Sequence, residues 1–258
     1  MLITKIFTRF TDSVSARLFN LKIYYYYTAR PIGINPLYYI RKWNEYSCKI
    51  TLKHKHPQLY EIINVMLAKS QSTGAEFSDY LHLYNFINRT NPKHILECGS
   101  GVTTAVIAYS IEINHQNDKS YQGHLVTMEE DPFYYEQIKS IFPDNLNKHV
   151  TFIHSERVET SYDGHLGSSY SKIPPAPYDF MFIDGPTDRK YFADLNYPKC
   201  FNADIINLIS SGNETIEAFL DQRIHTLTAL KKLLPHNRIT YNPITKLSHI
   251  YPLSTNDI

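Results

Sequence analysis

Short apolar runs recur along the C-terminal two thirds of this chain, and a polar residue able to bind a ligand follows several of them. Each run is typical of a buried strand, so the polar residue stands where the strand would end. In open α/β sheets, ligands bind outside the carboxyl ends of the strands. The residues at these positions are Glu97, Glu129, Ser155, Asp184 and Asp221. Their recurrence predicts a ligand site at one edge of a sheet.

The first of these runs, Ile95–Cys98, breaks at two glycines and leads at once into a helical pattern. Gly99 and Gly101 allow a sharp turn and let a ligand approach the backbone without a Cβ in the way. The free N–H groups of the following helix would face that ligand. Strand, glycine turn and helix are typical of a nucleotide-binding unit. The third glycine of the dinucleotide fingerprint would fall at Thr104, which disfavours NAD.

The pattern Glu-x-Gly-x-Gly over residues 97–101 resembles the first motif of class I S-adenosylmethionine-dependent methyltransferases. Two later stretches, Val126–Pro132 and Tyr178–Pro186, look like further motifs of this superfamily, in the same order. The likeness covers about residues 77–251. The Asp-Gly-Pro sequence at Asp184 resembles a bacterial group of small-molecule or glycan methyltransferase-like proteins. The resemblance implies S-adenosylmethionine as the cofactor.

The resemblance also implies roles for the residues of the predicted edge. The strand-one acid, Glu97, would help to hold the methionine end of the cofactor, while Glu129 would accept hydrogen bonds from both ribose hydroxyls. The sulfonium and ammonium charges favour an acidic pocket, whereas a pyrophosphate would not. The expected cofactor-binding residues are Glu97, Gly99, Gly101, Thr103, Glu129, Ser155 and Asp184.

Asp184 and Asp221 are the candidate catalytic residues. Asp184 would lie beside the transferable methyl, where it can orient or deprotonate an acceptor hydroxyl. In catechol O-methyltransferase, comparable acids and an asparagine hold magnesium. A divalent metal on Asp184, Asp221 and Gln222 is the less favoured alternative, because Gln222 departs from that pattern and no lysine matches. Arg189 and Arg223 would bind an anionic acceptor or pair with these aspartates.

The interpretation we favour is a methyltransferase that transfers to oxygen on a small molecule or sugar. The alternatives are a NAD-dependent oxidoreductase and a non-catalytic methyltransferase-like binding protein. The segment Ser161–Pro177 is long enough to be a lid, from which Tyr162, His165 and Tyr170 would touch the acceptor, or else a surface loop.

Strands alternate with helices from residue 93 onward, which predicts an α/β fold of the Rossmann-like kind. We expect a mostly parallel seven-stranded sheet with helices on both faces and a closing antiparallel hairpin. The strands are expected at about residues 95–98, 125–128, 150–153, 178–183, 215–220, 238–241 and 247–251. A helical N-terminal extension over residues 1–76 would precede a domain over residues 77–258.

The overall composition excludes several classes of protein. The 258 residues carry a net charge of +1, so nucleic acid is not an expected partner. Cys48, Cys98 and Cys200 are scattered, which argues against a disulfide framework or a zinc site and favours a reducing cytoplasm. We see no signal peptide and no apolar run long enough for a membrane span.

The first thirty residues have apolar side chains three and four apart, from Ile3 to Leu21, which predicts an amphipathic helix. This stretch contains five basic residues and one acidic residue. Such a helix can pack on the domain or on a second subunit, which we favour, or lie on a membrane surface.

Overall fold

The computed structural model describes residues 36–70, 76–188, 199–212 and 215–258. Residues 1–43 and 44–258 form two compact units. Of the first unit, only residues 36–43 are described, and they begin helix α2 (Pro36–Lys55). The helix expected over residues 1–30 lies outside the described residues, and the division of the chain at residue 76 stays a prediction.

A seven-stranded sheet forms the centre of the second unit, in the order β3-β2-β1-β6-β8-β10-β9. The parallel part comprises β3 (Val150–His154), β2 (His124–Glu129), β1 (His94–Cys98), β6 (Phe180–Ile183) and β8 (Ile216–Asp221). Strand β10 (Leu247–Leu253) pairs antiparallel with both β8 and β9 (Ile239–Tyr241). This arrangement confirms the predicted α/β sheet and its closing hairpin.

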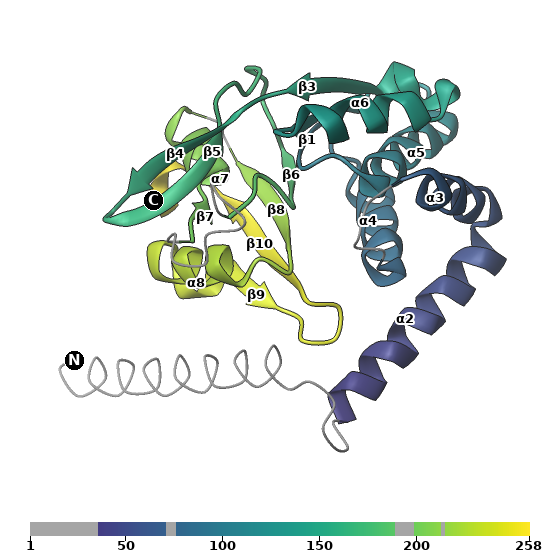
Figure 1. Ribbon diagram of the computed structural model, residues 1–258, viewed down its shortest axis with the longest axis horizontal. Coiled ribbons are helices and arrows are strands. Elements are labelled where there is room, and N and C mark those ends of the chain that lie inside the picture. The colour runs from purple at the N-terminus through teal and green to yellow at the C-terminus, as the bar shows by residue number, and fades with distance from the viewer. Residues whose placement is uncertain (1–35, 71–75, 189–198, 213–214) are drawn as a thin grey trace. The chain divides into compact units, whose positions relative to one another are not determined.

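Helices cover both faces of this sheet (Figure 1). Helices α3 (Pro57–Lys69), α4 (Phe77–Thr90), α5 (Val102–Asn117) and α6 (Pro132–Ile141) supply side chains to one core cluster. Ile95, Phe182 and Phe219 enter that cluster from the central strands. Their strand neighbours point to the opposite face, because successive side chains alternate across a strand. Helices α7 (Asp204–Ser210) and α8 (Ile224–Leu233) lie on that side (Figure 1).

Residues 161–170, the first part of the segment expected to be a lid or a surface loop, belong to a β-hairpin, so the loop alternative was wrong for this part and the lid role stays a prediction. Strands β4 (Arg157–Tyr162) and β5 (His165–Tyr170) pair antiparallel, and β5 also pairs with β7 (Phe201–Asn202) in a second, three-stranded sheet. Asp163 and Gly164, at φ 45° and 75°, form the two-residue turn. An Asp-Gly pair with positive φ at both positions matches the right-handed twist of the flanking strands. The polar composition of the segment had hidden this signal.

Residues 37–50 belong to α2. The amphipathic pattern is hard to see there, because Tyr39, Trp43 and Tyr46 are exposed and Leu52 is the buried residue of this helix. Helix α7 begins at Asp204, directly after β7. Short 3-10 turns complete the described fold: η1 (Asp144–His149), η2 (His236–Arg238) and η3 (Thr255–Asp257). No helix in the described ranges is both long and apolar enough to cross a membrane.

Candidate functional site

The glycine turn after β1 presses against the end of β6. Gly99 has φ +93°, a left-handed conformation that suits glycine, and a Cβ on it would lie 3.0 Å from the backbone of Asp184 and Gly185. A Cβ on Gly185 would in turn lie 2.7 Å from the Gly99 nitrogen. The Gly99 N–H donates to the Met128 carbonyl at the end of β2. The carboxyl ends of β1, β2 and β6 therefore meet at the glycine turn.

Glu97 fixes the start of helix α5 from below this turn. It is fully buried, and its two carboxylate oxygens accept hydrogen bonds from the hydroxyls of Thr103 (2.6 Å), Thr104 (2.6 Å) and Thr127 (2.7 Å). The Gly101 N–H donates to the Thr104 hydroxyl at 2.9 Å. Burial raises the pKa of Glu97 to about 7, although the three hydroxyls oppose the shift. Thr104 thus stands where the dinucleotide-binding fingerprint has its third glycine, and its hydroxyl binds Glu97 of β1.

Glu129 lies at the tip of β2 and reaches back to the glycine turn. One carboxylate oxygen accepts from the Ser100 N–H (3.1 Å) and hydroxyl (3.2 Å), and the other accepts from the Asp131 N–H (3.1 Å). Burial raises the pKa of Glu129 to about 7, and the neighbouring charge of Glu130 adds to the shift. A carboxylate with two oxygens at this position can still accept hydrogen bonds from a diol.

Glu130, which the sequence analysis did not single out, connects three parts of the site. Its carboxylate accepts from the Tyr170 hydroxyl at 3.0 Å and from the Thr187 N–H at 2.8 Å. The Tyr170 hydroxyl also lies 3.3 Å from the Met128 carbonyl. Tyr170 is therefore a buried support beneath the strand tips and not the acceptor contact that was expected of it. These partners are far apart in the sequence, so no local pattern could have revealed them.

Asp184 and Arg223 meet across the ends of β6 and β8. Nη2 of Arg223 lies 3.4 Å from Oδ1 of Asp184, and Nη1 donates to the Pro186 carbonyl at 2.8 Å. Nε of Arg223 is buried and has no hydrogen-bond partner among the described residues. Of the two arginines expected near the aspartates, Arg223 is thus in place, whereas Arg189 lies outside the described residues.

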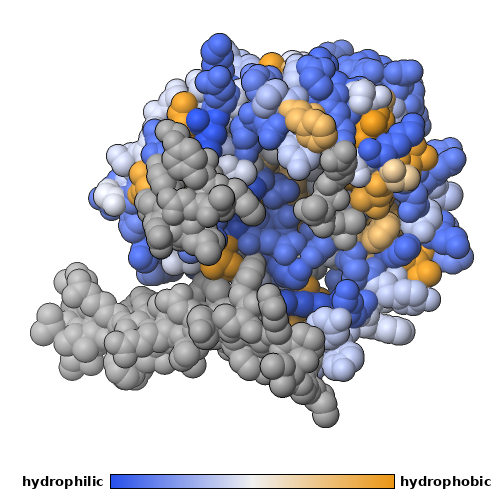
Figure 2. Space-filling view, in the orientation of Figure 1, coloured by the Kyte–Doolittle hydropathy of each residue, from blue (hydrophilic) through white to orange (hydrophobic). Residues whose placement is uncertain are grey.

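These residues surround a cavity of about 730 Å³. Its wall combines the glycine turn, four carboxylates, one guanidinium and a group of apolar and aromatic side chains. The lining residues are Ser70, Gly99, Ser100, Gly101, Glu129, Glu130, Asp131, Pro132, Tyr134, Gln137, Ile138, Ile141, Asp184, Gly185, Thr187 and Arg223. Figure 2 shows hydrophilic side chains gathered around a hollow near the middle of the drawn face.

The structure brings only part of the predicted site to this cavity. Gly99, Gly101, Glu129 and Asp184 line it. Glu97 and Thr103 bind each other behind the turn. The buried Ser155 hydroxyl donates to the Lys172 carbonyl and accepts from the Lys172 N–H, so it joins the end of β3 to the segment after β5.

Asp221 and Gln222 lie at the next strand end and do not line the cavity. Oδ1 of Asp221 is buried with no partner among the described residues, and burial, followed by the charge of Asp184, raises the pKa of Asp221 to about 7. The side-chain oxygen of Gln222 accepts from Nζ of Lys246 at 3.1 Å. In the described parts of the chain, no group of three or more His, Cys, Asp or Glu residues is arranged to hold a metal ion. Since an ammonium group contacts Gln222, these residues do not fit a metal site.

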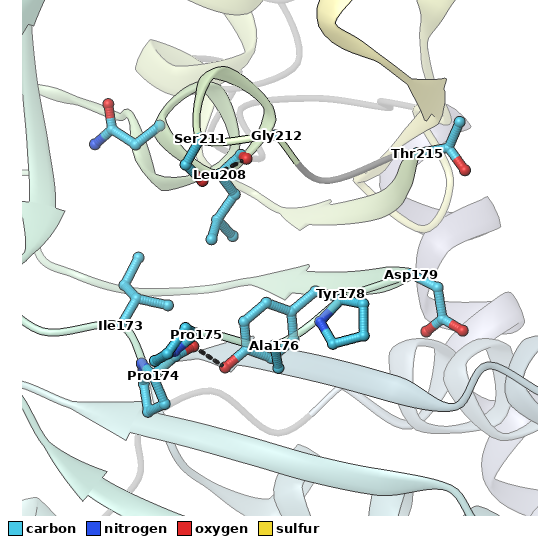
Figure 3. Close-up of a pocket in the computed structure, with 12 residues that line it drawn as sticks. Ile173, Pro174, Pro175, Ala176, Tyr178, Asp179, Leu208, Ser211, Gly212 and Thr215 are labelled. Atoms are coloured by element: carbon cyan, nitrogen blue, oxygen red, sulfur yellow. Dashed lines mark hydrogen bonds between the residues drawn. The ribbon is translucent and has the colours of Figure 1, made fainter.

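A second cavity, of about 930 Å³, lies beside the amino ends of β6 and β8. Figure 3 shows residues that line it. Its wall includes the proline-rich stretch before β6, where the Tyr178 hydroxyl donates to the Pro174 carbonyl at 2.8 Å. Asp179 caps the first residues of β1 by accepting from the Lys93 and His94 N–H groups. This edge holds the amino ends of β1, β6 and β8, where parallel α/β sheets do not usually bind ligands.

No family model matches the chain, and no curated protein matches it significantly. Solved structures resemble it in fold. An O-methyltransferase from Bacillus cereus in complex with S-adenosylhomocysteine is 15% identical, with a TM-score of 0.48 over 82% of this chain and 99% of its own. A methyltransferase from Podospora anserina bound to the same molecule is 13% identical, with a TM-score of 0.44 over 75% of this chain and 86% of its own.

The O-methyltransferase TomG from Streptomyces achromogenes, in complex with S-adenosylmethionine, is 10% identical, with a TM-score of 0.43 over 89% of this chain and 96% of its own. Similarities this distant do not indicate what the present chain binds. Its function has to be inferred from the cavity itself.

Proposed function

We propose that this chain binds S-adenosylmethionine and transfers its methyl group to an oxygen of a small molecule or sugar. One observation carries the proposal: the cavity at the glycine turn is lined by four carboxylates, one of them at the tip of β2. S-adenosylmethionine carries two positive groups, a sulfonium and an ammonium, which an acidic cavity of low dielectric attracts.

Each part of the cofactor has matching groups in this cavity. Glu129 would accept hydrogen bonds from the ribose hydroxyls. Pro132, Tyr134 and Ile138 offer an apolar wall for the adenine. At Gly101, which lines the cavity, a Cβ would meet nothing nearer than the Thr103 hydroxyl at 4.0 Å, so the missing side chain leaves room for the methionine chain.

The NAD alternative fits this cavity less well. A pyrophosphate would face Glu129, Glu130 and Asp131 and be repelled by them. The dinucleotide fingerprint needs a third glycine for close helix packing, and Thr104 instead places a hydroxyl between Gly101 and Glu97.

S-adenosylmethionine supplies an electrophilic methyl group when bound, so the protein mainly has to align an acceptor with it. Such alignment can contribute about 7–11 kcal/mol. Asp184, with 48% of its side chain exposed, is the candidate to orient or deprotonate an acceptor hydroxyl. Asp221 is a second candidate, although it stands further from the cavity wall. We include no metal in this proposal.

Calorimetric titration of the full chain with S-adenosylhomocysteine and with NAD tests the proposal. We expect S-adenosylhomocysteine to bind and NAD not to bind. Binding of NAD alone would support the oxidoreductase alternative. Binding of neither ligand would support the remaining alternative, a methyltransferase-like protein without the cofactor.

A further inference from the structure

Arg223 is the only Lys, Arg or His among the described residues that line the acidic cavity. We infer that Arg223 holds the carboxylate of the methionine part of S-adenosylmethionine, and so fixes the amino-acid end of the cofactor. This inference rests on the proposed function. It differs from the sequence-based expectation that Arg223 would bind an anionic acceptor.

The guanidinium has one edge that lacks a good acceptor. Nη1 is engaged by the Pro186 carbonyl at 2.8 Å, which anchors the group. Nε is buried without a partner among the described residues, and Nη2 makes only the 3.4 Å contact with Asp184. Nε and Nη2 lie on the same side of a guanidinium and together match the two oxygens of a carboxylate. A bound carboxylate would supply the acceptor that this edge is missing.

The charges around Arg223 also match the ligand. S-adenosylmethionine combines two cationic groups with a single carboxylate, and the cavity combines four acidic residues with a single base. Without Arg223, the negatively charged carboxylate of the ligand would enter a cavity whose wall carries only acidic side chains as charged groups. Arg223 is also the residue before helix α8, whose N-terminus adds a partial positive charge at this point.

The place of Arg223 favours the cofactor over the acceptor. Asp184, its neighbour, has its backbone 3.0 Å from the position of a Cβ on Gly99, so Arg223 stands close to the turn along which the methionine chain would run. Ammonium and carboxylate are attached to the same carbon of an α-amino acid. The acidic wall that attracts the ammonium and the arginine that binds the carboxylate can therefore hold one amino-acid head together.

Decarboxylated S-adenosylmethionine, which lacks only the carboxylate, gives a direct test by calorimetry. We expect the wild-type chain to bind S-adenosylmethionine about ten-fold or more tightly than the decarboxylated compound. In Arg223→Gln, the affinity for S-adenosylmethionine should fall by about the same factor, while the affinity for the decarboxylated compound should hardly change. Arg223→Lys keeps the positive charge but loses the pair of parallel N–H donors, so it should retain part of the preference for S-adenosylmethionine over the decarboxylated compound.

The comparison of the two ligands distinguishes carboxylate binding by Arg223 from a purely structural role of its side chain. Loss of the Pro186 contact would weaken both ligands equally, and that outcome would overturn the inference. Unchanged affinity for S-adenosylmethionine in Arg223→Gln would also overturn it and return Arg223 to the acceptor. Equal affinity of the wild type for the two compounds would overturn the inference even if no variant folds. If the wild type binds neither compound, the proposed function itself fails.

Discussion

Glu129 shows how one side chain can serve both the free protein and a ligand. Its carboxylate organises the free turn through Ser100 and Asp131. It is also buried beside Glu130, which raises its pKa to about 7. A group with this pKa is only partly ionised near neutral pH, so ligand binding and ionisation should be coupled.

Glu129→Gln should weaken S-adenosylhomocysteine binding by roughly 1.5–3 kcal/mol, because the ribose hydroxyls lose a charged acceptor. Affinity of the wild type should fall as the pH drops below about 7, since protonation removes that acceptor, and the variant should lack this dependence. Calorimetry over a range of pH measures both effects.

Asp131→Asn is the matched control for Glu129→Gln. It removes a charge from the same cavity wall but keeps the oxygen that accepts the Phe133 N–H and caps α6. We expect a much smaller loss of affinity in this variant. An equal loss in both variants would mean that the cavity acts through its overall charge and that the ribose is held elsewhere.

At the scale of elements, Glu97 joins β1 to both neighbouring elements. The parallel register sets Thr127 of β2 beside it, and the first turn of α5 supplies Thr103 and Thr104. The site therefore depends on a buried carboxylate that does not line the cavity. Burial of this carboxylate destabilises its charged form, while the three hydroxyl groups stabilise it, and the pH dependence of folding stability shows which effect is larger.

Glu97→Gln should gain stability relative to the wild type as the pH rises. Burial raises the pKa of Glu97 from 4.5 to about 7, so the folded protein binds an extra proton between these values. The wild type loses stability across this window as the pH rises, on the order of 3 kcal/mol, whereas the neutral variant does not. Urea unfolding of both proteins between about pH 5 and about pH 8 measures the difference.

Glu136→Gln, on the exposed side of α6, is the control and should show no such trend. If Glu97→Gln instead became less stable relative to the wild type at higher pH, the three hydroxyls would outweigh burial. The ionised carboxylate would then be a net stabilising group in the fold.

Much of the fold could be predicted, because each central strand is an apolar run that ends in a polar residue or a glycine. The same local order identified Gly99, Glu129 and Asp184, which line the cavity. Contacts between distant segments could not be predicted. Glu130 with Tyr170, and Arg223 with Pro186, depend on how the loops after β2, β5 and β6 meet in space.

The β4–β5 hairpin shows a different limit. Its strands alternate weakly, and only the Asp163-Gly164 pair marks the turn. A segment rich in Ser, Tyr and Gly looks like a loop in sequence, but cross-strand pairing and β7 give it regular structure.

On the scale of the whole molecule, charge is unevenly distributed along the sequence. The first 55 residues contain ten Lys and Arg against two Asp and Glu, so most of the acidic residues belong to the rest of the chain. The near-zero net charge therefore hides two parts of opposite sign. Opposite charge favours association of the N-terminal part with the acidic part of the same chain or of a second copy.

Deletion of residues 1–35 tests this expectation. If this segment packs on the domain or on a second subunit, the truncated protein should melt a few degrees lower or show a smaller assembly in solution. Association with liposomes should not change. Calorimetric melting, light scattering and co-sedimentation with neutral and anionic vesicles measure the three properties. Loss of binding to anionic vesicles, with melting and mass unchanged, would contradict the packing role and show that the basic segment attaches the protein to a membrane surface.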